Sequence, residues 1–141
     1  MLRYRLIHPQ ILHALGTAGH GSTVLIADGN YPFTTGAAPG AQRVYLNLAP
    51  GLVGVTDVLR ALVDAMPIEA AHVMVPDEGP EPPIFAEFRA LLPDTPLQSL
   101  GRFPFYEAAR EPSCALVVAT GEQRIYANLL LTVGVVPPPK Q

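Results

Sequence analysis

One stretch near the start of the chain constrains the fold most, because it has the pattern of a buried strand enclosed by turn residues. The residues from Val24 to Ala27 are all apolar, Gly19-His20-Gly21 precedes them, and Asp28 follows at once. A short apolar run bounded by turn residues is typical of a buried strand. Asp28 is therefore expected at the carboxyl end of a strand, where open α/β sheets gather ligand-binding groups.

His20 lies in the glycine-flanked turn before this strand and is the other candidate for chemistry. Its imidazole is the side-chain type that exchanges protons near neutral pH. A straight strand would separate His20 from Asp28 by about 25 Å, at ~3.3 Å per residue. Either the turn folds back, or a second subunit supplies one of the two residues. Taken alone, His20 can equally be a turn histidine bonded to a carbonyl, and Asp28 a turn cap.

The composition favours one domain that assembles with copies of itself. We expect a domain over residues 1–136 and a Pro-rich tail over 137–141. Apolar residues make up 49% of the chain and charged residues only 15%, which is few for the surface of a small monomer. A net charge of −3 argues against nucleic acid as a partner, and no apolar run approaches the length of a membrane span. The single cysteine, Cys114, is predicted to be a buried thiol in a cytoplasmic protein.

The order of the predicted elements indicates an α/β fold. A helix is expected from His8-Pro9 to a C-terminal cap at Gly19. The long segment 29–42 is expected to be a functional loop. Thr56 or Asp57 is expected to cap the helix over 55–66, which has the clearest pattern. Further helices are predicted over 55–66, 83–92 and 103–110, and strands over 23–28, 43–48, 72–75, 115–119 and 128–135. Together they predict a single layered α/β/α domain with a central mixed sheet covered by helices on both faces.

Two later clusters carry groups suited to a polyol. Arg102 stands beside Phe103, and its planar fork of donors fits sugar hydroxyls or a carboxylate. Tyr126 and Asn128 are two residues apart, so they point to the same side if the chain there is extended. Each cluster also has an ordinary explanation, a surface arginine at a helix start or a polar strand edge.

Several kinds of site are not supported. The four histidines form no pair at ligand spacing, and Cys114 has no partner, so no metal is expected. No GxSxG, P-loop or GxGxxG pattern is present, which leaves nucleophilic catalysis and nucleotide binding without a motif. The sequence thus predicts no cofactor.

Five short motifs together resemble one known family. They follow in order along the chain and span about residues 6–136: Gly19-His20-Gly21, Asp28 with Tyr31-Pro32, Arg102-Phe103 with Phe105-Tyr106-Glu107, Thr120-Gly121-Glu122, and Tyr126-Ala127-Asn128. In this combination the chain resembles the family of D-ribose pyranases and L-fucose mutarotases. The resemblance implies an isomerase without cofactor or metal that interconverts anomers, or ring forms, of a free monosaccharide. It also implies a homo-oligomer, commonly a decameric ring, with active sites at subunit contacts.

The resemblance also implies roles for individual residues. His20 matches the proton donor, Asp28 a substrate-binding aspartate, and Arg102 the substrate-binding arginine of the fucose branch. The segment Tyr126-Ala127-Asn128 matches the sugar-binding tripeptide. Ring opening needs one acid and one base. We assign His20 to the ring oxygen as a hypothesis, and Tyr126 or a water to the anomeric hydroxyl.

Two departures bear on the substrate. Ser22 stands where the fucose branch usually carries an acidic residue, and Ala127 is the ribose-type residue of the tripeptide. The cluster of Arg102 with its aromatic neighbours favours the fucose branch, so L-fucose or a related hexose is the expected substrate. The alternatives are D-ribose pyranase-type activity, a non-catalytic sugar-binding protein in transport or regulation, and a structural oligomer without ligand.

Overall fold

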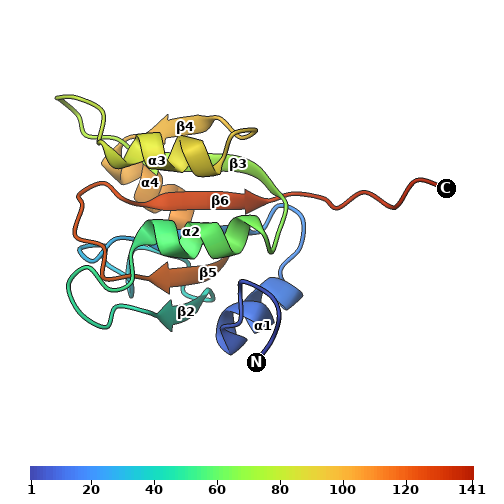
Figure 1. Ribbon diagram of the computed structural model, residues 1–141. Helices are drawn as coiled ribbons and strands as arrows, with labels where there is room; N and C mark the ends of the chain where they lie inside the picture. The colour runs from blue at the N-terminus through green and yellow to red at the C-terminus, as the bar shows by residue number, and fades with distance from the viewer.

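The computed structural model describes all 141 residues and contains one six-stranded sheet in the order β2-β5-β1-β6-β3-β4 (Figure 1). All paired neighbours are parallel except β6, which runs antiparallel to both β1 and β3. The strands are β1 (Thr23–Ala27), β2 (Gln42–Tyr45), β3 (Ile68–Met74), β4 (Leu97–Leu100), β5 (Cys114–Ala119) and β6 (Leu129–Val133). The predicted mixed central sheet is confirmed.

Helices cover both faces of this sheet, as the sequence predicted. They are α1 (Pro9–Thr17), α2 (Val55–Val63), α3 (Ile84–Leu91) and α4 (Arg102–Ala109). In Figure 1, α2 and α3 lie in front of the sheet and α4 lies behind it. None of the four has the length and apolar character that a helix needs to cross a membrane.

Strand β1 contributes side chains to the hydrophobic cores on both faces of the sheet. Val24 and Ile26 belong to the larger hydrophobic core, together with residues of α1, α2 and α3. Leu25 and Ala27, which point the other way, belong to a second core with α4. All four side chains are fully buried, so the apolar run identified a strand buried on both faces. Cys114 is a buried free thiol in the second core.

The segment between β1 and β2 forms part of the layer that contains α4. Its three alanines at 37, 38 and 41 pack in the second core. Arg43 fixes this loop, because its guanidinium donates hydrogen bonds to the carbonyl oxygens of five loop residues: Phe33, Thr34, Ala37, Ala38 and Ala41. The Tyr31 hydroxyl adds a bond to the Gly36 carbonyl at 2.6 Å.

The helix caps differ from the predicted ones at Gly19 and in part at Asp57. Helix α1 ends with an extended residue at Ala18, so Gly19 does not close it. Helix α2 begins after Gly54, and neither Thr56 nor Asp57 is its N-cap residue. Asp57 instead lies in the first turn of the helix and accepts a hydrogen bond from the Gly54 N–H at 2.9 Å. This is the reach-back half of a capping box, which a residue at the third helical position can supply.

The strands differ from the prediction mainly at their ends. β3 begins at Ile68, four residues before the predicted strand, while the strands predicted over 43–48 and 128–135 are shorter in the structure. β4 was not predicted at all. It is an edge strand with two exposed polar residues, Gln98 and Ser99, so it lacks the apolar alternation that marks a half-buried strand.

Candidate functional site

The strand directions bring several predicted residues to one edge of the sheet. The carboxyl ends of β1, β3 and β4 lie there, together with the amino end of the antiparallel β6. Asp28 follows β1, Asn128 precedes β6, and Arg102 follows β4. These residues surround a pocket of about 220 Å³, whose full lining is Asp28, Asn30, Tyr31, Met74, Arg102, Tyr106, Ile125, Tyr126 and Asn128.

Asp28 and Asn128 form a reciprocal pair at the base of the pocket. The Asp28 N–H donates to Asn128 Oδ1 at 2.8 Å, and Asn128 Nδ2 donates to Asp28 Oδ2 at 3.1 Å. The Asn30 N–H donates to the other carboxylate oxygen at 3.0 Å. These hydrogen bonds fix the orientation of both side chains, although Asp28 and Asn128 are 100 positions apart in the sequence.

Burial sets the charge preference of Asp28. The residue is only 4% exposed, and this burial raises the pKa of its carboxyl above the usual range. The hydrogen bonds from the Asn30 N–H and the Asn128 amide oppose the rise. A carboxylate whose charge is costly to keep accepts further hydrogen bonds readily, which suits it to holding a sugar hydroxyl.

Tyr126 lines the pocket, although the chain at this residue is not extended. Its φ is 58°, in the left-handed region that residues other than glycine rarely adopt. The chain at Tyr126 is therefore not extended, the condition under which Tyr126 and Asn128 were expected to point to the same side, yet both residues line the same pocket. Ala127 is fully buried between them and does not line it.

Arg102 forms the charged wall of the pocket. Its guanidinium carbon lies 5.7 Å from the centre of the Phe103 ring and 5.8 Å from that of Tyr106. The side-chain contact with Tyr106 raises the pKa of Arg102, so the guanidinium stays charged. On its other side Tyr106 meets Tyr31 edge to face, with ring centres 5.4 Å apart.

Tyr31 is a wall of the pocket and not a proton acceptor. Burial raises the pKa of its hydroxyl further above the neutral range. The hydroxyl is also engaged with the Gly36 carbonyl. Among the tyrosines of the pocket, Tyr31 therefore contributes shape.

Like Ala127, His20 is a predicted site residue that does not line the pocket, and it lies at the opposite edge of the sheet. It precedes β1 at the amino edge of the sheet, while Asp28 follows β1 at the carboxyl edge. The turn that carries it is fastened to the end of β6, because the Gly21 N–H donates to the Val133 carbonyl at 3.0 Å and the Val133 N–H donates to the Ser22 carbonyl at 2.9 Å. The turn is therefore held at the amino edge of the sheet and does not fold back towards Asp28.

His20 has an acidic partner that was not predicted from the sequence. His20 Nε2 lies 2.9 Å from Oε2 of Glu69, the second residue of β3. The Ser22 hydroxyl accepts a hydrogen bond from the Gly19 N–H at 3.2 Å and so braces the turn from within. The partner comes from 49 residues along the chain, and only the sheet order places it next to the turn.

Met74 and Asn30 also line the pocket, although neither was predicted as a site residue. Met74 is the last residue of β3, so the rule that ligand groups gather at the carboxyl ends of strands could have found it. Asn30 lies in the turn after Asp28, and it lines a second pocket of about 430 Å³ as well. That larger pocket contains none of the predicted site residues. We place the site in the smaller pocket because the charged and aromatic groups meet there.

The pocket offers hydrogen-bonding groups and aromatic walls. A carboxylate, an amide, a guanidinium and a phenol face one small space, which matches the donors and acceptors of a polyol. No group of three or more His, Cys, Asp or Glu side chains lies close enough together to hold a metal ion. The arrangement can therefore hold a small polyhydroxylated ligand by its hydroxyls.

Comparison with known proteins gives a consistent result. The model of the RbsD / FucU transport protein family matches residues 1–136. A fucose mutarotase of Danio rerio is 33% identical over 149 residues, covering 96% of this chain and 94% of its own. A D-ribose pyranase of Paracidovorax citrulli is 33% identical over 135 residues, covering 96% and 98%. A crystal structure of the fucose mutarotase from Streptococcus pneumoniae in complex with L-fucose superposes with a TM-score of 0.84 at 27% identity, covering 97% of this chain and all of that one.

Proposed function

This chain belongs to the RbsD / FucU transport protein family, and we propose that it acts on L-fucose or a closely related hexose. It is a sugar mutarotase, an isomerase that interconverts the anomers of a free monosaccharide. The observation that carries the choice of site is the pocket in which Asp28, Arg102, Tyr126 and Asn128 meet. We expect the enzyme to work in the cytoplasm, where a lone thiol such as Cys114 stays reduced.

The reaction needs one acid and one base and no change of oxidation state. The acid protonates the ring oxygen while the base removes the proton of the anomeric hydroxyl, and the bond between C1 and the ring oxygen breaks to give the open aldehyde. Rotation about the C1–C2 bond turns the other face of the aldehyde to the hydroxyl. Closure then reverses both proton transfers. Positioned groups accelerate such a step by roughly 10²–10⁴-fold.

The residues of the pocket divide between holding the sugar and moving its protons. The buried Asp28–Asn128 pair presents acceptors and donors of fixed orientation to neighbouring hydroxyls. Arg102 supplies a charged fork of donors opposite them, with its aromatic neighbours beside it. We assign Tyr126, or a water next to it, to the anomeric hydroxyl. The Ala127 backbone connects the two sugar-binding side chains.

His20 is the proton donor in this proposal, and a second copy of the chain delivers it. Within one subunit β1 separates His20 from the pocket. The side chain of His20 is 59% exposed at the amino edge, so it is free to approach the carboxyl edge of a neighbour. A ring of subunits that dock amino edge to carboxyl edge would complete every pocket, and a decamer is the assembly we expect.

Exchange NMR on equilibrated sugars tests this function. L-fucose, D-galactose, D-glucose and D-ribose are compared with the native protein and with His20→Ala. His13→Ala serves as the control, because His13 is an exposed histidine of α1 that does not line the pocket. We expect faster α/β exchange of L-fucose, lost in His20→Ala and kept in His13→Ala. Faster exchange of ribose alone would assign the pyranase activity, and binding without faster exchange would make the protein a sugar binder.

Mixing two inactive variants tests whether subunits share the site. His20→Ala removes the donor from one edge, and Asp28→Ala disables the pocket at the other. If a site combines residues of two copies, dissociating and reassembling the mixed variants creates some pockets with both residues intact. We expect partial recovery of exchange activity in the mixture. No recovery from mixed oligomers that form normally would contradict a shared site.

A further inference from the structure

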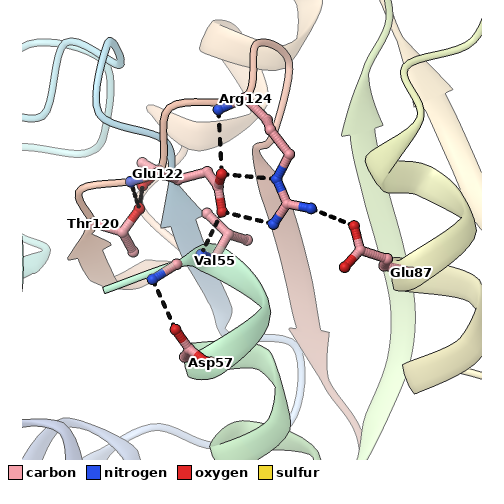
Figure 2. A network of polar contacts seen from close by, with 8 residues as sticks. Val55, Asp57, Glu87, Thr120, Glu122 and Arg124 are labelled. Carbon is pink, nitrogen blue, oxygen red and sulfur yellow. Dashed lines mark hydrogen bonds and ion pairs between the residues drawn. The ribbon is translucent and has the colours of Figure 1, made fainter. Parts of the chain in front are cut away.

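In the loop that carries Tyr126, a network of polar contacts joins Glu122 and Arg124 to each other and to Val55 and Glu87 (Figure 2). Glu122 and Arg124 belong to this loop, Val55 begins α2, and Glu87 projects from α3. The Arg124 guanidinium donates to Glu122 from Nε at 2.8 Å and from Nη2 at 3.0 Å, and its remaining nitrogen Nη1 contacts the Glu87 carboxylate. The network thus joins the loop to two helices on one face of the sheet.

The Glu122 carboxylate is fully used within this network. Besides the guanidinium, it accepts from the Arg124 N–H at 3.2 Å and from the Val55 N–H at 3.1 Å. Val55 is the first residue of α2, so the carboxylate satisfies a free donor at the positive end of the helix. Glu122 is 6% exposed. A buried carboxylate that accepts four hydrogen bonds therefore fixes the position of the chain where the loop leaves the sheet.

The backbone before Glu122 is held just as closely. The Thr120 hydroxyl donates to the Ala27 carbonyl at the end of β1, and the Gly29 N–H donates to the Glu122 carbonyl at 2.8 Å. A Cβ on Gly121 would lie 2.3 Å from the Leu52 carbonyl oxygen, so only glycine fits there. The loop therefore starts from a fixed position next to the pocket.

The rest of the loop has few other restraints. From 123 to 127 it contains no helix or strand, and Arg124 is the only residue there whose side chain makes a hydrogen bond. Tyr126 follows two residues later in its left-handed conformation, which costs energy for a residue with a Cβ. A conformation of this kind persists only where its surroundings hold it.

We propose that Glu122 and Arg124 are positioning residues that hold Tyr126 in the sugar pocket. The proposal rests on the proposed function for its effect on catalysis, but not for its effect on Tyr126 itself. The two ends of the loop are fixed separately, by the Glu122 carboxylate at one end and by the Asn128–Asp28 pair at the other. Arg124 fastens the part between them, and Glu87 fastens Arg124 to α3.

Arg124→Lys is the test variant, because it keeps the charge and loses the planar fork. The matched control is Glu81→Gln, which breaks another forked Arg–Glu pair, with Arg89, that makes no hydrogen bond to the loop. We expect kcat for sugar exchange to fall about tenfold in Arg124→Lys and to stay unchanged in Glu81→Gln, since small displacements of a reacting group have large effects on rate. Unchanged activity in Arg124→Lys would overturn the proposal.

A double-variant comparison separates positioning from a general structural role. In a Tyr126→Phe background the hydroxyl is already gone, so Arg124→Lys should lower kcat further by less than about twofold. A full tenfold loss in that background would show that Arg124 does not act through Tyr126. If Arg124→Lys does not fold, Glu87→Gln replaces it, with an expected loss of two- to threefold that also vanishes with Tyr126→Phe.

NMR of protein labelled at tyrosine gives a readout that needs no activity. The signal of Tyr126, assigned by its absence in Tyr126→Phe, reports the left-handed backbone. We expect this signal to shift in Arg124→Lys and to stay in place in Glu81→Gln. An unmoved signal refutes the positioning role. A native protein that exchanges no sugar would refute the proposed function and leave this test intact.

Discussion

Replacing Glu122 with glutamine should destabilise the protein in a way that depends on pH. Both oxygens of the Glu122 carboxylate accept hydrogen bonds, from Val55 N–H and from the Arg124 side chain and backbone. Glutamine has nearly the same size but only one accepting oxygen. Its NH₂ group would face another donor, so the variant loses both a charge and a matched hydrogen-bonding partner.

The size of the effect follows from the ionisation of Glu122. The hydrogen bonds from Arg124, opposed by burial, lower the pKa of Glu122 from 4.5 to about 2. At about 1.4 kcal/mol per pH unit, the charged form contributes about 3 kcal/mol to the free energy of unfolding. The Arg124 side chain is 44% exposed, and screening by solvent reduces this contribution to about 2 kcal/mol.

The sign of the pH dependence is fixed by the direction of the shift. The folded pKa lies below the unfolded one, so the stabilisation is fully present above about pH 4.5 and is lost as the pH falls towards 2. The free energy of unfolding of the native protein should therefore exceed that of Glu122→Gln by about 2 kcal/mol at pH 7. At pH 3 the difference should be less than about half as large.

Urea unfolding of both proteins at pH 7 and pH 3 measures this difference. The protein concentration is kept constant, because assembly would couple stability to concentration. Glu81→Gln removes an exposed carboxylate of the same type and should have little effect at either pH. A loss of stability in Glu122→Gln that is the same at both pH values, or is below about 0.5 kcal/mol at pH 7, would contradict this prediction.

Two further variants test the loops around the site. Arg43→Ala leaves the carbonyls of loop 33–41 without their shared donor, so we expect a loss of about 3 kcal/mol in urea unfolding and faster proteolysis within the loop; resistance equal to the native protein would contradict this. In Gly121→Ala the new Cβ would lie 2.3 Å from a carbonyl oxygen, so expression should yield unfolded protein or a loss above about 3 kcal/mol, whereas Gly40→Ala, with nothing within 4 Å, should be stable.

The sequence predicted those parts of the site that depend on local pattern. The apolar run before Asp28 identified a strand and placed the aspartate at its carboxyl end. Arg102 was expected beside aromatic rings, and the short spacing between them in the sequence brings them together on α4. These features depend on residues a few positions apart, so composition and period were enough to find them.

Features that depend on sheet order could not be predicted in the same way. The contact between His20 and Glu69 joins a turn to a strand 49 residues later. The left-handed backbone of Tyr126 depends on the contacts that hold the loop on either side of it. The residue type alone predicts a different conformation. β4 was missed because Gln98 and Ser99 are exposed on an edge strand, where burial imposes no apolar pattern.

The reversal of one strand decides what lies at each edge of the sheet. β6 runs against β1 and β3, between which it is placed, so its amino end lies among their carboxyl ends. This is why Asn128, directly before β6, can pair with Asp28, directly after β1. The same reversal brings Val133, at the far end of β6, to the turn that carries His20. A parallel β6 would exchange these ends, separate Asn128 from Asp28, and leave the candidate pocket without its buried amide.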